Sequence, residues 1–398
     1  MLEITGNHIG KLSDEDLRTL IVRLCEAELC RLNLPLSAVT AGGHQNAADG
    51  GLDVRVELPN DSLDLDFIPK NATGFQVKQQ DMPAASIDAE MRPKGKLRQS
   101  IYELGSKRGA YVIVSGQGSV ADFALNNRKA AMQAAVLDLP QGSALILDFY
   151  DRDRIARWVR LYPGVALWLR EHIGEPLAGW RPYGNWAYGD TVDSEYLFDD
   201  KCRIVAPQRA AGNAPLTVEH GIQAIRTVLR NPHGIVRLVG LSGTGKTRLV
   251  QALFDTKVGS DALDRSIVTY VDQGSEQSPT PSARDMAHQL AANGQRAIVV
   301  VDNCNPATHR DLAQAVSATG GLVSLITVEY DVSEDEPEET QVFRLEPASE
   351  KIIEEILQRL TPSVSQIDRT RIAEFSGGNS RIALALARTV TTVAALPR

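Results

Sequence analysis

The sequence predicts an α/β protein of 398 residues with two domains, the second built on a parallel sheet that helices cover on both faces. Three observations lead to this fold class. A glycine-rich loop at residues 240–247 lies between a predicted strand and a predicted helix. Near-continuous strands rich in β-branched residues recur after it, separated by helical stretches, which is typical of buried parallel strands. Helices and strands also mix in the first 172 residues, which therefore form an α/β domain of their own.

The first predicted domain covers residues 1–172. Its first helix is expected at residues 13–31, because Ser13 can cap it, acidic residues occupy its first turn, and apolar residues recur at helical spacing. Runs of apolar and β-branched residues predict three strands, and two later helices follow from small and apolar residues. The strands are expected at 52–58, 74–78 and 110–115, and the later helices at 121–136 and 151–169.

Residues 173–207 form a linker rich in large aromatic side chains, among them Trp180 and Trp186. A linker that runs free in solvent is polar, so we expect this one to pack across the domain boundary. The core of the second domain covers residues 208–345, and a helical subdomain covers residues 346–398. Within the core, a helix is expected at 218–230 and strands at 235–239, 267–271, 297–301 and 322–327.

The composition limits the location and the partners of the protein. The net charge is −8, so the chain has no overall basic surface for nucleic acid, and contact with DNA needs a local basic patch. No apolar run is long enough to cross a bilayer, and the N-terminus lacks the regions of a signal peptide. The four cysteines show no metal-ligand spacing. We therefore expect a cytoplasmic protein without membrane contact, whose cysteines are reduced.

The loop at residues 240–247 matches all eight positions of the pattern that binds nucleotide phosphates. Its glycines let backbone N–H groups point at the phosphates, Lys246 is expected to reach the β- and γ-phosphates, and Thr247 is expected to hold Mg²⁺. The pattern therefore predicts that the loop wraps around the phosphates of ATP or GTP. The residues expected to bind nucleotide in this loop are Gly240, Ser242, Gly243, Thr244, Gly245, Lys246 and Thr247.

A second metal ligand is expected at the end of an adjacent buried strand, and Asp302 ends such a strand. Asn303 follows, where many ATPases have the acidic residue that activates water. An amide cannot accept that proton, so either hydrolysis is slow or conditional, or the base lies elsewhere. Thr327 ends the following strand, where it either senses the γ-phosphate or only caps the strand.

Charged and polar residues on two strands of the first domain form a second candidate site. Alternate residues of a strand share a face, so Gln76 and Lys78 point the same way, and pairing with the strand that follows Asp53 brings the three together. A carboxylate that holds a divalent metal beside a lysine suits phosphodiester hydrolysis. Glu26 or Glu28, on the first helix, is expected to supply another acidic group. The alternative is a salt-bridged surface without a catalytic role.

The phosphate loop, Asp302, Thr327 and the Gly-Gly-Asn-Ser element at residues 377–380 together resemble the nucleotide-binding module of STAND NTPases, relatives of the AAA+ proteins. The resemblance covers residues 208–398 and implies a P-loop NTPase sheet followed by a helical subdomain. In that family a Gly-x-Pro motif in the helical subdomain touches the nucleotide, and Ser380 stands here in place of the proline. The resemblance also implies a sensor, which lies beyond the end of this chain or is missing from this protein.

The first domain resembles the PD-(D/E)xK nucleases, and more closely their Mrr-like restriction branch, over residues 10–172. This resemblance implies a restriction-endonuclease-like α/β domain that cuts DNA, with Asp53 as a metal ligand beside the other two site residues. The shared order is a glycine-rich lead at Gly42-Gly43 that reaches Asp53, then Gln76-Val77-Lys78, a helix at 97–106 and a strand at 111–115.

A basic stretch follows the Gln-x-Lys strand. It either tracks a DNA backbone through contacts with the phosphates or forms a solvated surface loop. Its cations are Arg92, Lys94, Lys96 and Arg98.

A nuclease domain joined to a STAND-type NTPase resembles bacterial antiphage defence proteins of the Avs kind. The resemblance implies a metal-dependent DNA endonuclease that cuts double-stranded DNA and is controlled by a switch that binds ATP and Mg²⁺. It also implies that a phage-derived trigger drives homo-oligomerisation, which turns the nuclease on. The alternatives are an ATP-dependent restriction translocase, against which we find no helicase motif set, and a non-catalytic NTP-regulated scaffold.

Overall fold

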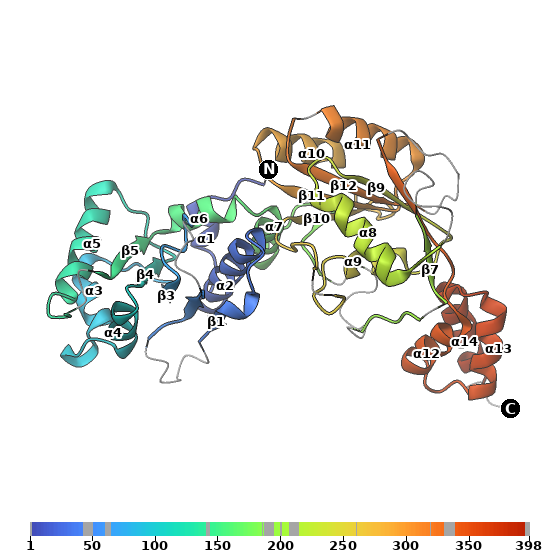
Figure 1. Cartoon of the computed structure of the whole chain (residues 1–398), viewed down its shortest axis with the longest axis horizontal. Coiled ribbons are helices and arrows are strands. Elements are labelled where there is room, and N and C mark those ends of the chain that lie inside the picture. Colours follow the sequence, from blue (N-terminus) through green and yellow to red (C-terminus); the bar gives the residue numbers. More distant parts are fainter. Residues whose placement is uncertain are drawn as a thin grey trace. The chain divides into compact units, whose positions relative to one another are not determined.

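The structure is a computed structural model in which the chain divides into two compact units, Met1–Pro176 and Leu177–Arg398 (Figure 1). Two of the features expected from the sequence lie partly outside the described residues: most of the glycine-rich lead before Asp53, and the expected start of the second domain's core. The structure describes residues 2–42, 51–59, 65–140, 144–184, 186, 195–199, 201–206, 215–259, 261–318, 320–329 and 339–394.

The first unit contains a five-stranded sheet with the strand order β1-β2-β3-β4-β5. The first three strands run antiparallel, and β3, β4 and β5 run parallel. The pairing of β2 with β3 places Val54 opposite Phe75, so Asp53 lies just before β2 and beside the middle of β3. The strands are β1 (Val39–Ala41), β2 (Val54–Glu57), β3 (Ala72–Lys78), β4 (Ala110–Ser115) and β5 (Ile146–Tyr150).

Helices cover both faces of this sheet. The long α2 begins where the sequence predicts, because the Ser13 side chain accepts a hydrogen bond from the backbone N–H of Asp16. The single helix expected at 151–169 is instead two helices, since Pro163 starts a new one. The helices are α1 (Gly6–Ile9), α2 (Asp14–Arg31), α3 (Ala84–Met91), α4 (Gln99–Ser106), α5 (Asp122–Ala135), α6 (Arg152–Val159) and α7 (Pro163–His172), with 3₁₀ turns at Leu36–Ala38 and Pro93–Gly95.

The second unit contains an eight-stranded sheet with the order β6-β10-β11-β12-β9-β13-β7-β8. Its five central strands are parallel, as the β-branched runs predict, and the outer strands are antiparallel to their neighbours. The strands are β6 (Trp180–Arg181), β7 (Arg203–Val205), β8 (Leu216–Thr217), β9 (Ile235–Val239), β10 (Val268–Asp272), β11 (Ala297–Asp302), β12 (Val323–Val328) and β13 (Gln341–Leu345).

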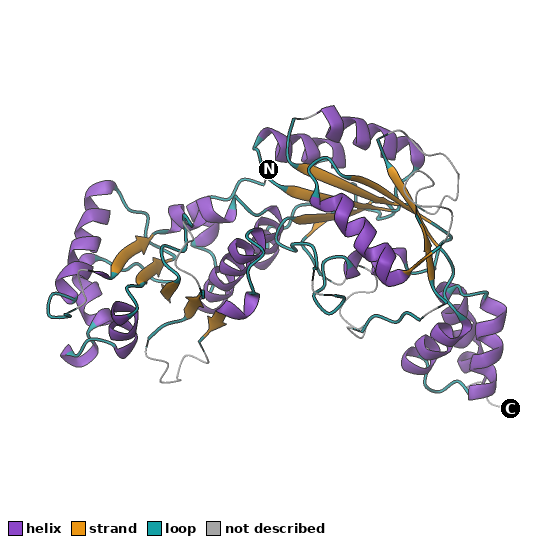
Figure 2. Cartoon of the chain, viewed as in Figure 1, coloured by secondary structure: helices purple, strands orange, loops and turns teal. Residues whose placement is uncertain are grey.

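Helices lie on both faces of this sheet, and a helical bundle follows it (Figure 2). Val236 and Ile326 point into the core that α8 and α9 cover, whereas Arg237 and Thr327 point to the opposite face, where α11 lies. The bundle has its own small apolar core. The helices are α8 (Val218–Arg230), α9 (Lys246–Ala252), α10 (Ala283–Ala292), α11 (Pro306–Ala318), α12 (Glu350–Leu360), α13 (Gln366–Ser376) and α14 (Ser380–Ala394).

The described part of the aromatic-rich segment, expected to be a linker, is built into the second unit. Trp180 starts β6, which pairs with β10, and its indole N–H donates to the carbonyl of Pro281 at 2.8 Å. Trp186 stacks on Tyr270 of β10 with 4.6 Å between the ring centroids. Large aromatic side chains gain most by burial against a sheet, which explains why this segment is ordered there. No helix in the described residues has the length and apolar character needed to cross a membrane.

Candidate functional site

The phosphate loop connects the end of β9 to the start of α9. Gly240, Gly243 and Gly245 all have positive φ values, of 144°, 83° and 95°, which side chains rarely adopt. A Cβ atom on Gly240 would lie 2.6 Å from the carbonyl oxygen of Leu345, so the loop also needs glycine there for close packing against the end of β13. A Cβ atom on Gly245 would meet nothing within 4 Å, so this part of the loop faces open space. The loop therefore has the backbone of a phosphate cradle.

Lys246 is folded back onto this loop. Its ammonium group donates to the carbonyl oxygens of Gly240 and Leu241, each at 2.8 Å, and the residue is 7% exposed. Burial lowers the pKa of Lys246 to about 8; the Asp302 carboxylate opposes this effect and the Arg381 guanidinium adds to it. The ammonium is therefore held against the loop itself, and phosphates that contacted it there would favour its charged form.

The two expected metal ligands of the second unit lie together. The Thr247 hydroxyl donates to Asp302 Oδ2 at 2.7 Å, and the Tyr270 hydroxyl donates to the same oxygen at 3.0 Å. Burial raises the pKa of the Asp302 carboxyl, although these hydrogen bonds oppose the rise. A hydroxyl and a carboxylate beside a phosphate loop are the oxygen ligands that Mg²⁺ takes in nucleotide sites. The expectation that the strand of Asp302 is adjacent to the phosphate-loop strand is wrong, because β12 lies between β9 and β11.

Asn303 binds the carboxylate of Asp272, a residue that sequence reasoning missed. Its side-chain amide donates to Asp272 Oδ1 at 2.7 Å, and Asp272 ends β10 directly opposite Asp302. The alternative that a catalytic base lies elsewhere therefore has a specific candidate. The sequence offers a signal for it, since Asp272, like Asp302, ends a strand of buried, mostly apolar residues.

Thr327 does not lie at the nucleotide side of the sheet. It pairs with Val301, so its side chain points away from the face that carries Asp302. Its hydroxyl lies 2.7 Å from His309 Nδ1 and donates to Glu329 Oε1 at 3.3 Å, in a cluster that is fully buried. Glu329 also forms a buried ion pair with Arg237 at 2.8 Å. The structure thus places Thr327 in an internal polar network and supports neither a γ-phosphate contact nor a simple cap.

The helical bundle contacts the phosphate loop directly. Asn379 Nδ2 donates to the carbonyl of Ser242 at 2.6 Å. The backbone N–H and the hydroxyl of Ser380 both donate to the carbonyl of Gly243, at 3.0 and 2.8 Å. Arg381, which sequence reasoning missed, donates to the Ser242 hydroxyl at 3.1 Å. Ser380 therefore ties the bundle to the loop even though it replaces the proline of the related motif.

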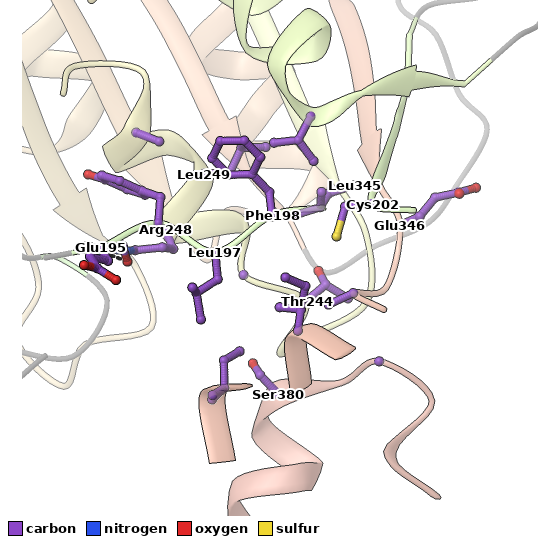
Figure 3. Close-up of a pocket in the computed structure, with 18 of the residues that line it drawn as sticks. Glu195, Leu197, Phe198, Cys202, Thr244, Arg248, Leu249, Leu345, Glu346 and Ser380 are labelled. Carbon is purple, nitrogen blue, oxygen red and sulfur yellow. Dashed lines mark hydrogen bonds between the residues drawn. The ribbon is translucent and has the colours of Figure 1, made fainter. Parts of the chain in front are cut away.

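A largely apolar cavity of about 200 Å³ adjoins this loop and reaches the helical bundle (Figure 3). Leu197, Phe198 and Leu249 form part of its apolar wall, and Thr244 of the loop and Ser380 of α14 also line it. An apolar slot beside a phosphate cradle suits the base and sugar of a nucleotide.

In the first unit, the structure brings Asp53 and Gln76 together. Asp53 Oδ2 accepts hydrogen bonds from Gln76 Nε2 at 2.9 Å and from the backbone N–H of Val77 at 2.7 Å. Burial raises the pKa of the Asp53 carboxyl, although the Val77 hydrogen bond and the cations Arg18 and Lys78 oppose the rise. Lys78 itself forms an ion pair with Glu90 of α3 at 3.3 Å. Glu90 is a site residue that sequence reasoning missed.

Glu28 does not belong to this site. It is 2% exposed, accepts a hydrogen bond from the indole N–H of Trp158 at 2.9 Å, and pairs with Arg31 at 3.0 Å. Arg18, which contacts Asp53, lies ten residues earlier on α2, about 15 Å along the helix axis. Glu26 is about 12 Å from Arg18 by the same measure. The acidic residue of α2 that the structure places near Asp53 is Asp14, which pairs with Arg18 at 2.5 Å.

The fit of this site to a metal ion depends on Gln76. The residue is 4% exposed, and its Oε1 atom is buried without a hydrogen-bond partner in the structure. A buried amide oxygen beside a carboxylate is a suitable ligand for a hard divalent cation, and binding one would satisfy it. No three His, Cys, Asp or Glu side chains are grouped to hold a metal in the described ranges. A metal here would thus use Asp53, the Gln76 oxygen, and water or backbone oxygens.

The basic stretch after β3 divides into two kinds of cation. The guanidinium of Arg98 donates to the carbonyl and the carboxylate of Glu90, both at 2.7 Å, and Arg92 donates to the carbonyl of Ala135 at 2.6 Å. Lys94 and Lys96 are exposed. The two arginines therefore hold the local structure, and the two lysines are the ones that can contact a phosphate backbone.

The comparisons with known proteins give structural likenesses only. No protein-family model matches the chain, and no curated protein matches it. Among solved structures, Caenorhabditis elegans PCH-2 is similar at 14% identity and a TM-score of 0.32, covering 46% of this chain and 62% of that one. Rhizobiales Trip13 is similar at 15% identity and a TM-score of 0.28, covering 43% of this chain and 70% of that one.

A STAND protein with a tetratricopeptide repeat sensor from Pyrococcus horikoshii is similar at 11% identity and a TM-score of 0.25, covering 41% of this chain and 28% of that one. The chain therefore spans less than two thirds of the PCH-2 chain and under a third of this STAND protein. The class of the second unit follows from its own geometry. A parallel sheet with a phosphate loop, an inward lysine and a bonded threonine–aspartate pair defines a P-loop NTPase fold.

Proposed function

We propose that the chain is a metal-dependent DNA endonuclease controlled by an ATP-binding switch of the STAND type, and that it acts in bacterial antiphage defence. The observation that carries the nuclease proposal is the pair of Asp53 and Gln76, with its buried and unsatisfied Gln76 oxygen. Lys78 lies two residues further along the same strand and on the same face. A carboxylate, an amide oxygen and a lysine at one sheet position suit phosphodiester hydrolysis.

The roles of the three residues follow from their places. Asp53 and the Gln76 oxygen would hold Mg²⁺, which when bound would supply Lewis acidity toward the scissile phosphate. Lys78 steadies the charge that develops on the phosphate, and Glu90 keeps the lysine side chain in position. Lys94 and Lys96 contact the backbone of double-stranded DNA.

The switch rests on the second unit. Lys246, Thr247 and Asp302 bind ATP with Mg²⁺, and the apolar cavity holds its nucleoside part. Asn303 cannot accept a proton, so either turnover is slow or conditional, or Asp272, which Asn303 contacts, is the base. The helical bundle bonds to the same loop that binds the phosphates, so nucleotide occupancy changes the position of the bundle. A phage-derived trigger then drives homo-oligomerisation, which brings several nuclease units onto one DNA.

Cleavage of double-stranded DNA with Mg²⁺ or Mn²⁺ tests the proposal. Asp53→Ala and Lys78→Ala should each abolish cutting and leave ATP binding intact, because the two sites lie in different units. Lys107→Ala is a matched control, since this lysine of the same unit pairs with Glu57 and not with the site. The assay should include chains that are forced to oligomerise. Cutting that persists in both site variants, free of contaminating nuclease, would overturn the assignment.

A non-catalytic NTP-regulated scaffold is the second candidate. One observation favours it: Asp53 is paired with Arg18, and Lys78 is paired with Glu90, as in a salt-bridged surface. Under this alternative, forced oligomers do not cut DNA with either metal, and Asp53→Ala does not change metal binding.

A further inference from the structure

We propose that Arg18 occupies the metal position of the first unit as an internal cation, and that it sets how tightly Asp53 takes a divalent ion. This inference rests on the proposed nuclease function and deepens it, since it concerns the regulation of the same site. It makes Arg18 a positioning residue that acts through Asp53.

The first step concerns the two oxygens of Asp53. Oδ2 is already committed to the N–H groups of Gln76 and Val77. Oδ1 lies 2.9 Å from Arg18 Nε, and Arg18 is the only cation that pairs with this carboxylate in the part of the chain that the structure describes. The oxygen that a metal would approach is therefore the one that the guanidinium covers.

The second step concerns what holds Arg18 there. Its Nη2 atom pairs with Asp14 Oδ2 at 2.5 Å, one turn earlier on α2. Asp14 Oδ1 in turn accepts from the backbone N–H of Gln79, directly after β3. The guanidinium thus bridges a carboxylate of the helix and a carboxylate of the sheet. Asp14 also gives Arg18 a partner to which it can swing fully when Asp53 binds another cation.

The third step is electrostatic. A guanidinium and a divalent ion on one carboxylate lie within a few ångströms of each other and repel, and the repulsion is strong where water is scarce. Metal binding must therefore displace Arg18 from Asp53, and the free energy of that displacement lowers the affinity for the metal. The Gln76 oxygen is buried without a hydrogen-bond partner in this paired state, so it is available to a metal ion. The site can therefore take a metal ion once Arg18 leaves Asp53.

Mn²⁺ binding to the full chain, followed by calorimetry and by electron paramagnetic resonance of free Mn²⁺, tests this inference. Asp53→Asn keeps any binding at Thr247 and Asp302. The difference between the wild type and this variant is therefore the binding that belongs to the first unit. Arg18→Gln should tighten the Asp53-dependent binding by about tenfold or more. Arg18→Lys retains the charge and should bind Mn²⁺ close to the wild-type value. Arg31→Ala removes a cation from the same helix that does not contact the site, and should change nothing.

The possible outcomes distinguish a failure of the role of Arg18 from a failure of the proposed nuclease function. Asp53-dependent Mn²⁺ binding that is equal or weaker in Arg18→Gln overturns the role of Arg18 and leaves the proposed metal site standing. If neither the wild type nor Arg18→Gln shows Asp53-dependent binding, the metal site itself is wrong, and the proposed nuclease fails with it. Thermal melting of each variant ensures that a lost signal is not lost folding.

Discussion

Raising the pH should weaken ATP binding through Lys246. Its ammonium is buried against two carbonyl oxygens, and burial lowers its pKa to about 8 in the nucleotide-free protein. Phosphates that contact the ammonium favour its charged form, so binding raises its pKa again. Above pH 8 the protein must therefore take up a proton when it binds ATP, and the affinity falls as protons become scarce.

The size of the effect follows from the charged fraction. With a pKa of about 8, roughly three quarters of the lysine is charged at pH 7.5 and about 3% at pH 9.5. The dissociation constant for ATP should consequently rise about 25-fold across this range, which is about 2 kcal/mol. The phosphates themselves contribute little, since their second pKa is about 6.

Calorimetry at pH 7.5, 8.5 and 9.5 measures this dependence, and repeating it in buffers of different ionisation enthalpy counts the proton taken up. Lys246→Ala provides the control. Its ATP binding should be weak and should lack the pH dependence that the titration of Lys246 causes. A wild-type dissociation constant that stays within threefold from pH 7.5 to 9.5 would refute the reasoning, because it would mean that the buried ammonium keeps an ordinary pKa.

Three further predictions concern the second unit. Asp302→Asn should weaken binding of Mg²⁺–ATP at least tenfold and leave metal-free ATP binding nearly unchanged, as calorimetry with and without a chelator can measure. His309 is 1% exposed, and burial lowers its pKa to about 4, so the unfolded state takes up the proton first and stability falls as the pH drops from 6.5 to 4. Urea unfolding should show a loss of about 3 kcal/mol over this range that His309→Gln lacks, and equal losses in both proteins would contradict it. Asn379→Ala removes the hydrogen bond to Ser242 and should lower the stability of the contact between the bundle and the loop by about 1 kcal/mol. Amide exchange at the start of α14 should then be several-fold faster. Unchanged exchange would show that this contact does not hold the bundle.

The parallel sheet of the second unit was predictable because buried parallel strands leave a direct mark, a run of β-branched residues before each helix. The order of the strands leaves no such mark. β12 follows β11 in the sequence and inserts between β11 and β9, so Asp302 reaches Thr247 across one intervening strand. A carboxylate at a strand end is a local feature, whereas its neighbour depends on how the connections cross the sheet.

The pair of Asp53 and Gln76 was predictable from period-two alternation and an antiparallel register. The acidic residue of α2 that lies near this pair, Asp14, was not predictable in this way. Glu28 faces Trp158, which lies 130 residues away in the sequence, and only tertiary packing decides which side of α2 meets the sheet. The place of the Thr327 side chain was not predictable for a related reason. Its register with Val301 puts it on the opposite face of the sheet from Asp302.

The strands β6 and β7, which precede the phosphate loop in the second unit, have a consequence for how this unit avoids aggregation. β6 pairs along β10 at one border of the eight-stranded sheet, and β7 pairs along β13 toward the other. A chain that began at residue 208 would lack both of these strands. It would expose two rows of unpaired backbone N–H and C=O groups, which are templates for pairing with another molecule. The strands before the phosphate loop thus protect the sheet from such pairing, and they belong to the second unit, which begins at Leu177.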